Sequence, residues 1–333
     1  MFLVTGATGH IGNVLVRQLL EKGEKVRALI QPGESRKPLE DLGVETVEGD
    51  VLDTSALWEA FKGIRGVFHL AGVISIMPGS DPLVWRVNVD GTRNVIKAAL
   101  RAGIERLVYI SSIHALQRIP HGSVMDESLP FDADNPYGAY DRSKAAASLE
   151  VQKAAQEGLE AVIVCPTGVI GPYDFRGSEM GAVIRQAAEG RPSPYVDGAY
   201  DFVDVRDVAD GLMCAAEGGR AGETYILSGQ KISVRYLLET VREITGRAFT
   251  SIKIPFDLAR FAARFTPWYY EKTQARPRFT PYSLEVLRSN ADISHAKATR
   301  ELGYRPRPLY ESIADTVRWF FENRKALTNE RTK

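Results

Sequence analysis

A tyrosine and a lysine four residues apart, Tyr140 and Lys144, form the pair with the clearest capacity for acid–base chemistry. The alanine-rich run after Lys144 predicts a helix, where this spacing places both side chains on one face, one turn apart. An ammonium beside a phenol favours the phenolate, so we expect Lys144 to lower the pKa of Tyr140. Such a tyrosine gives a proton to a carbonyl oxygen or takes one from a hydroxyl. Taken alone, the pair also fits an ordinary surface helix.

Two serines, Ser111 and Ser112, follow the apolar segment 106–110, which is typical of a buried strand. Ligands of open parallel sheets bind beyond the carboxyl ends of the strands. A serine at this point can hydrogen-bond the carbonyl that Tyr140 protonates, although paired serines are also common in turns. His114 lies two residues further on, where it faces either the substrate or a plain loop.

A glycine-rich turn follows the first apolar strand almost at residue 1. Gly6, Gly9 and Gly12 are spaced by three, and apolar residues with helical periodicity come after them. Glycines at a strand-to-helix turn let the backbone approach a pyrophosphate at the helix N-terminus. The position between strand and helix meets the context required of a dinucleotide-binding fingerprint.

Apolar and amphipathic segments alternate, which predicts an α/β fold with a Rossmann-type doubly wound parallel sheet. Strands are expected at 2–5, 25–30, 44–48, 66–70, 106–111 and 160–165, and helices near 11–22, 54–62, 82–102, 138–157 and 178–190. After Pro172 the composition shifts towards proline, aromatic residues and arginine. We therefore expect a dinucleotide-binding domain at 1–172 and mainly a smaller C-terminal substrate lobe at 173–333, with the chain crossing back.

The composition is that of an ordinary globular protein, with 44% hydrophobic and 25% charged residues among 333. The 42 basic and 42 acidic residues cancel, which argues against a nucleic-acid partner. Two cysteines make no disulfide framework, and a strand starting at residue 2 leaves no room for a signal peptide. We expect a cytoplasmic protein with a small-molecule substrate, no metal site and no attachment to a membrane.

These motifs, in this order and separation, resemble the extended short-chain dehydrogenase/reductase family, which belongs to the NAD-dependent epimerase/dehydratase superfamily. The resemblance runs from residue 1 to about residue 322 and is nearest to the branch of dihydroflavonol reductases, cinnamoyl-CoA reductases and 3β-hydroxysteroid dehydrogenase-like proteins. Further matching segments are 49–51, 69–72, 88–94, 165–172, 202–209 and 302–306.

The resemblance implies a role for each catalytic candidate. Tyr140 is the general acid/base, Ser112 orients the reacting oxygen, and Lys144 lowers the tyrosine pKa and holds the nicotinamide ribose. The resemblance and the glycine turn place the following residues around the cofactor: Gly6, Thr8, Gly9, His10, Ile11, Gly12, Gln31, Arg36, Lys37, Asp50, Val51, Leu70, Ala71, Gly72, Asn88, Tyr140, Lys144, Pro166, Thr167, Gly168 and Val169. Asn88 also fits a role in supporting the sheet.

The end of the second strand bears on the choice of cofactor. An acid there binds the ribose 2′-hydroxyl of NAD, whereas basic residues accept the 2′-phosphate of NADP. Residues 26–32 contain no acid, and Arg36 and Lys37 follow, which favours NADP(H) over NAD(H). Gln31 stands where reductase relatives tend to carry an arginine, and this weakens the preference. Asp50 matches the family aspartate that binds the adenine amine.

The leading hypothesis is an NAD(P)-dependent oxidoreductase that transfers a hydride between nicotinamide and a ketone, an aldehyde or a secondary alcohol. The alternatives are a nucleotide-sugar epimerase/dehydratase with retained NAD and a non-catalytic NAD(P)-binding regulator. Residues 200–205 lack the arginine and histidine of sugar-nucleotide members, and residues 113–115 lack the Asp-Glu pair of dehydratases. Retention of Ser112, Tyr140 and Lys144 argues against a regulator.

Three further expectations concern surfaces. The aromatic segment 256–270 fits a membrane-surface helix, a lid or core packing, and burial is expected because a single apolar stripe usually packs inward. A homodimer is expected through helices 82–102 and 138–157, where small residues allow close approach: Ala98, Ala99, Ala145, Ala146 and Ala147. Motif position places four residues at the substrate pocket: Ser75, Met77, Tyr173 and Phe175.

Overall fold

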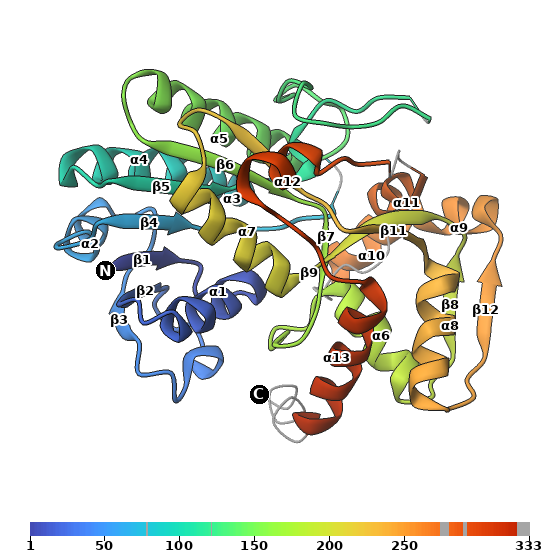
Figure 1. Ribbon diagram of the computed structural model, residues 1–333. Coiled ribbons are helices and arrows are strands. Elements are labelled where there is room, and N and C mark those ends of the chain that lie inside the picture. The colour runs from blue at the N-terminus through green and yellow to red at the C-terminus, as the bar shows by residue number, and fades with distance from the viewer. Residues whose placement is uncertain (78, 121, 274–279, 289–291, 325–333) are drawn as a thin grey trace.

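A seven-stranded parallel sheet forms the centre of the computed structural model, which describes residues 1–324 except 78, 121, 274–279 and 289–291 (Figure 1). The strand order is β10-β6-β5-β4-β1-β2-β3, and every neighbouring pair is parallel. The strands are β1 Phe2–Thr5, β2 Val26–Ile30, β3 Glu45–Glu48, β4 Gly66–His69, β5 Arg106–Ile110, β6 Ala161–Pro166 and β10 Thr224–Leu227. The predicted doubly wound fold is confirmed.

Helices cover both faces of this sheet. They are α1 His10–Glu21, α2 Thr54–Ala60, α4 Gly91–Ala102, α5 Ala139–Gln156, α7 Val205–Gly218 and α12 Ala296–Leu302. Helices α2, α4 and α5 share one buried cluster with Leu3 and Leu107, whereas α1, α7 and α12 share the other with Val4 and Val108. Successive strand residues point to opposite faces, so a sheet covered on both sides needs strands that are apolar throughout.

The remaining elements build a smaller lobe beside the sheet (Figure 1). A three-stranded sheet has the order β11-β9-β7, and β8 pairs with β12. The bounds are β7 Gly168–Ile170, β8 Ser193–Val196, β9 Ala199–Asp204, β11 Gln230–Ser233, β12 Ser251–Ile254, α6 Glu179–Ala188, α8 Val234–Thr245, α9 Phe256–Ala263, α10 Thr266–Thr273, α11 Pro281–Arg288 and α13 Leu309–Glu322. Strand β10 lies beyond residue 172 yet completes the large sheet. The domain boundary at residue 172 stays a prediction.

The single helix expected at 82–102 is interrupted. Helix α3 (Pro82–Trp85) passes into a π-helical segment, Arg86–Asp90, before α4 begins. A π-turn accommodates one extra residue and is frequent at functional sites. Here it contains Asn88, which is buried. The spacing of apolar residues does not reveal a single residue inserted into a helix, so the sequence predicted one continuous helix over 82–102.

The alanines expected to face a dimer partner lie mostly inside the chain. Ala98, Ala99, Ala145 and Ala147 are buried in the core of one chain, against the sheet and the neighbouring helix. The prediction that they allow a second chain to approach is therefore wrong for these four. Their small side chains let α4 and α5 pack closely against each other within one chain. The homodimer itself stays a prediction.

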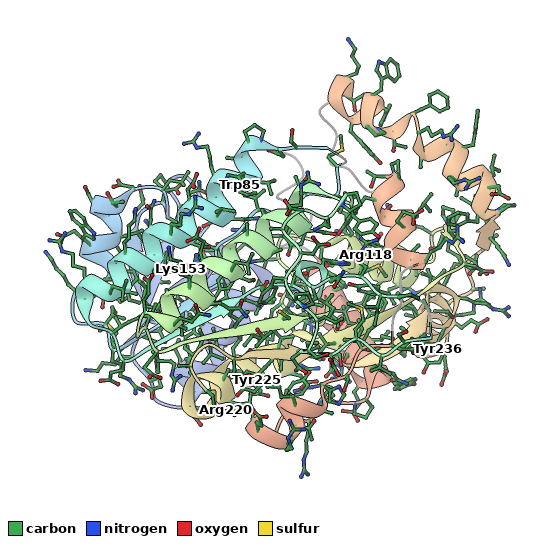
Figure 2. All side chains as sticks on the ribbon, turned by 90° about the horizontal axis from the view of Figure 1, so that it is seen from above. Trp85, Arg118, Lys153, Arg220, Tyr225 and Tyr236 are labelled. Atoms are coloured by element: carbon green, nitrogen blue, oxygen red, sulfur yellow. The ribbon has the colours of Figure 1, made fainter. Side chains whose placement is uncertain are left out.

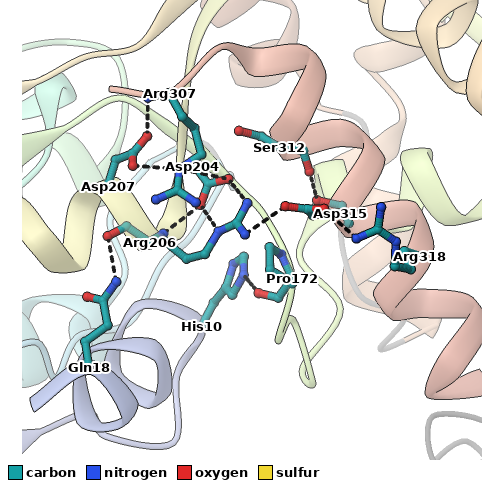
Figure 3. A network of polar contacts seen from close by, with 11 residues as sticks. His10, Gln18, Pro172, Asp204, Arg206, Asp207, Arg307, Ser312, Asp315 and Arg318 are labelled. Carbon is teal, nitrogen blue, oxygen red and sulfur yellow. Dashed lines mark hydrogen bonds and ion pairs between the residues drawn. The ribbon is translucent and has the colours of Figure 1, made fainter. Parts of the chain in front are cut away.

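A charged network joins α7 to the C-terminal segments (Figure 3). The carboxylate of Asp204 caps α7 by accepting the backbone N–H of Arg206 at 2.8 Å, and the Arg206 guanidinium binds it as well. Arg206 also donates to Asp315 of α13 at 2.8 Å, while Arg307 donates from Nε to Asp207 at 2.7 Å. The Asp204 side chain is fully buried. These ion pairs hold α13 and the segment before it against the N-terminal end of α7.

Candidate active site

The glycine turn packs directly against the loop after β4. Gly6 has φ +68°, and a Cβ atom there would lie 2.7 Å from the backbone nitrogen of Ala71. A side chain at Gly12 would collide with the Gly6 carbonyl oxygen. Helix α1 begins at His10, and the N–H groups of its first turn have no acceptor inside the helix. Closely approached backbone and free N–H groups fit the pyrophosphate of a dinucleotide.

The loop that follows β7 lies over this turn. The Arg176 guanidinium donates to Thr8 Oγ1 at 2.7 Å and forms an ion pair with Glu34. His10 donates from Nε2 to the Pro172 carbonyl at 2.9 Å. Two of the residues expected at the cofactor, Thr8 and His10, thus connect the glycine turn to the second lobe.

The ends of β2 and β3 meet where the adenosine is expected. Gln31 donates from Nε2 to Asp50 Oδ2 at 2.8 Å, and Arg36 pairs with Glu48 at 3.2 Å. Glu34, three residues past Gln31, accepts that residue's backbone N–H at 3.3 Å. Glu34 lies outside residues 26–32, and the turn folds it back onto the end of β2.

The other residues expected around the cofactor lie at the carboxyl ends of the large sheet's strands or on the segments that follow them. They are Gly9, Ile11, Lys37, Val51, Leu70, Ala71, Gly72, Pro166, Thr167, Gly168 and Val169. Among them Gly72 lies close to Asn88, since an added Cβ would lie 3.1 Å from Asn88 Oδ1. The expected cofactor residues therefore share one edge of the sheet.

Ser112 and Tyr140 are brought together at the same edge. Ser112 follows β5 and caps a short 3₁₀ helix, Ile113–Ala115, by accepting the backbone N–H of His114 at 3.2 Å. Tyr140 lies in the first turn of α5 and hydrogen-bonds with the Ser112 side chain, which lowers the pKa of the phenol. Burial acts in the opposite direction and is stronger, so the pKa of Tyr140 is raised overall.

Lys144 directs its ammonium into the sheet. Its Nζ donates to the Ile110 carbonyl at 2.6 Å and to Tyr109 Oη at 3.1 Å. Burial lowers the pKa of Lys144 to about 7. The expectation that Lys144 lowers the pKa of Tyr140 is thus not met in this arrangement, because β5 supplies nearer acceptors for the ammonium.

Asn88 and Ser111 form buried hydrogen bonds that connect α5 to the loop after β4 and to the end of β5. Asn88 accepts the Val73 N–H at 2.8 Å and donates to the Val73 carbonyl at 3.0 Å and to Ser143 Oγ at 2.9 Å. Its side chain therefore joins the loop after β4 to α5. Ser111 is buried and shares a 2.7 Å hydrogen bond with Ser148, also on α5. This geometry favours Ser112 over Ser111 for contact with a substrate.

A cavity of about 180 Å³ lies next to the Ser112 turn. Most of its lining is apolar or aromatic: Ile113, Ile119, Pro120, Met125, Tyr137, Tyr200 and Ile293. His114 also lines it and shares a 2.8 Å hydrogen bond with Tyr200 Oη. Tyr173 and Phe175, expected here from motif position, instead pack against Trp319 of α13. Neither of them, nor Ser75 or Met77, lines this cavity.

A buried ion pair beside Tyr140 was not anticipated from the sequence. Asp141 is fully buried, pairs with Arg118 at 3.3 Å and accepts a 2.6 Å hydrogen bond from Tyr282 Oη. Arg118 also lies over the Tyr137 ring at 3.5 Å. The only local signal was an acid directly after Tyr140, since Tyr282 lies 141 residues away.

Comparison with known proteins identifies the family of the chain. The model of the NAD dependent epimerase/dehydratase family matches residues 2–228, which include the glycine turn, Ser112, Tyr140 and Lys144. The chain belongs to this family. The family consists of enzymes, and the resemblance to extended short-chain dehydrogenases/reductases is confirmed.

Two relatives and one solved structure of this family align over nearly the whole chain. Sterol demethylase protein B of Methylococcus capsulatus is 36% identical, with 96% of this chain and 98% of the relative covered. A putative dihydroflavonol 4-reductase of Synechocystis is 35% identical, with 96% and 94% covered. The crystal structure of gox2253 has a TM-score of 0.84 at 34% identity, with 97% and 98% covered. The chain is therefore an NAD(P)-dependent enzyme of the epimerase, dehydratase and reductase class.

Proposed function

We propose that this enzyme reduces a ketone or aldehyde group on an apolar substrate, using a nicotinamide cofactor. The observation that carries the proposal is the lining of the cavity beside Ser112, where apolar and aromatic side chains predominate. Of its two cations, Arg118 is bound to the buried carboxylate of Asp141, and Arg288 lies over the Phe256 ring at 4.7 Å. The diphosphate of a nucleotide sugar needs cations that remain able to bind it. The names of the two relatives, which refer to a sterol and to a flavonoid reductase, support the same substrate class.

The side chains divide the chemistry between them. When bound, the nicotinamide supplies a hydride for the carbonyl carbon. The hydroxyl of Ser112 donates a hydrogen bond to the carbonyl oxygen, and Tyr140 Oη gives that oxygen its proton. Burial keeps the Tyr140 phenol protonated at neutral pH, which suits the reductive direction. Lys144 lies one turn further along α5, and its ammonium holds the ribose and stabilises the phenolate once it leaves the Ile110 carbonyl and Tyr109 Oη.

For the cofactor we propose NADP(H). Arg36 is exposed, and its ion pair with Glu48 is open to solvent on both sides, so a 2′-phosphate can replace the carboxylate. Glu34 is the acid that would repel this phosphate, but it is paired with Arg176. The ratio of kcat/KM with NADPH to kcat/KM with NADH measures the preference.

Replacement of Tyr140 tests the catalytic assignment. Tyr140→Phe should reduce NADPH-dependent turnover of apolar ketones by at least about a hundredfold, because the proton donor is removed. Cofactor affinity, measured by fluorescence titration, should be retained. Tyr236→Phe is the matched control, because Tyr236 lies exposed on α8 (Figure 2) and should leave turnover unchanged. Unimpaired turnover by Tyr140→Phe would contradict the assignment.

The family description also fits an epimerase or dehydratase, which regenerates its cofactor in each cycle and has reason to retain it. A reductase exchanges its cofactor at every turnover. Nucleotide released by denaturing the purified protein separates the two. We expect less than stoichiometric nucleotide, and near-stoichiometric NAD⁺ would favour the epimerase or dehydratase instead.

A further inference from the structure

Two consecutive helices, α9 and α10, carry the most exposed group of large apolar side chains in the described part of the chain. We call residues 256–273 the aromatic arm. Five of its side chains are 50–63% exposed: Leu258, Phe261, Phe265, Trp268 and Tyr269. In Figure 2 the two helices stand away from the sheet at the upper right, and their side chains extend outward. The expectation that the apolar stripe of this segment packs inward is therefore wrong for these side chains.

The arm is oriented opposite to an ordinary amphipathic helix. Ala259 and Ala263, four residues apart, are the side chains that α9 buries against the body of the protein. Leu258, Phe261 and Phe265 lie on the outer side, and the two phenylalanine rings contact each other edge to face at 5.5 Å. A helix that turns alanine inward and phenylalanine outward leaves a contiguous apolar surface in water, which marks an interaction site.

Basic residues accompany this apolar surface. The sequence of the arm, residues 256–273, has three basic and two acidic residues, whereas the charges of the whole chain cancel. Among the arm's cations, Arg260 and Arg264 alternate with the exposed apolar positions. Aromatic side chains beside arginines and lysines are the composition of helices that lie in the interface of an anionic lipid bilayer. No helix in the described residues is long and apolar enough to cross a membrane.

We propose that the aromatic arm attaches the enzyme to an anionic lipid surface. The arm is also connected to the substrate cavity. Helix α9 packs on α11, where Arg288 lies over the Phe256 ring at 4.7 Å. Glu285 and Arg288 of α11 in turn line the cavity beside Ser112. An apolar substrate dissolved in the lipid would thus reach the cavity along α11. This last step rests on the proposed reductase function, whereas the attachment does not.

Vesicle flotation of the full chain tests the attachment. The protein should float with phosphatidylcholine vesicles that contain phosphatidylglycerol, and less with phosphatidylcholine alone. Adding salt should weaken the binding to the anionic vesicles. The double substitution Phe265→Ala/Trp268→Ala should lower the partition coefficient at least about tenfold, because two apolar side chains no longer leave water. Arg260→Gln should lower it about fivefold, on anionic vesicles only.

Trp58→Ala is the matched control, because Trp58 is also exposed but lies on α2, outside the arm. All variants should keep the wild-type melting temperature and the turnover of a water-soluble ketone. Wild-type protein that stays unbound with both vesicle types would overturn the proposal. So would arm variants that float like Trp58→Ala, or that halve the molar mass in vesicle-free solution, which would show that a second copy covers the arm. Flotation without any ketone reduction would refute the reductase proposal and leave the attachment intact.

Discussion

At the scale of single residues, burial brings the pKa of Lys144 close to neutral pH. It is buried, and its two acceptors, the Ile110 carbonyl and Tyr109 Oη, are both uncharged. Burial alone therefore dominates, and the pKa falls to about 7. A lysine with uncharged acceptors and a pKa near 7 changes its hydrogen-bond partners and its protonation state with a small change in free energy when a ribose hydroxyl and a phenolate come within reach.

This pKa has a consequence for stability. Between pH 7 and 10.5 the unfolded chain binds more protons at Lys144 than the folded chain does, so the free energy of unfolding rises with pH. Below pH 7 both states are protonated and the contribution is constant. The difference between wild type and Lys144→Met, from urea unfolding across this range, should follow that curve. Lys153→Met, at an exposed position of the same helix, should give a flat difference. A flat curve for Lys144→Met would contradict the shift.

The sequence predicted the residues of the site better than their contacts. Ser112, Tyr140 and Lys144 belong to short patterns, and the parallel sheet brings the ends of those patterns together at one edge. Tyr109 and Tyr282 were not identified, because their partners depend on packing between distant segments. The rise in the pKa of Tyr140 that burial causes also cannot be predicted from residue spacing, since it depends on how many groups cover the phenol.

At the scale of elements, the turn between β1 and α1 requires glycine for two separate reasons. Gly6 has a positive φ, and a Cβ atom there would meet backbone atoms of Leu70 and Ala71 at 2.7–2.8 Å. Backbone atoms at this distance cannot move aside as a flexible side chain can. The approach of this turn to the loop after β4 therefore tolerates no side chain.

Gly6→Ala and Gly23→Ala separate the two reasons. Gly23 has φ +78° and open space around its Cβ position, so its replacement should cost about 1 kcal/mol of backbone strain. Gly6→Ala should cost the same strain and about 1–3 kcal/mol more for overpacking. Urea unfolding of both variants measures the difference. Equal losses would show that the turn relaxes around the added methyl group.

For the strands and helices predicted up to residue 190, most boundaries followed from apolar periodicity, because strands buried on both faces and amphipathic helices differ clearly in pattern. The boundaries of the elements beyond residue 190 were not predicted. The exceptions have local causes. The π-helical segment around Asn88 shifts the helical phase by one residue, which no periodicity shows. The aromatic arm has the expected helical period, but its apolar side faces outward, and a period alone does not state which side is covered.

At the scale of the whole molecule, the two lobes are held together by charges as well as by apolar packing. Asp207 lies beneath the segment that leads into α13, and burial raises its pKa although Arg307 binds it through both its backbone N–H and its guanidinium. Arg307→Met should lower the free energy of unfolding by about 3 kcal/mol at neutral pH, because the carboxylate stays buried without its cation.

The double variant Asp207→Asn/Arg307→Met should recover part of that loss, since the orphaned charge is removed too. Arg235→Met, which breaks an exposed ion pair on α8, should leave the urea midpoint unchanged. Losses that simply add in the double variant would show that Asp207 and Arg307 contribute independently.

The network around α7 also orders events during synthesis. The partner of the buried Asp204 carboxylate, Arg206, is only two residues further along the chain, so its cation is synthesised almost at the same time. Asp207 must wait for Arg307, which the ribosome adds a hundred residues afterwards. Strand β10 and helix α7 therefore emerge long before the charge beneath them has its partner. The nascent chain therefore carries the Asp207 carboxylate without its cation until residue 307 has been added.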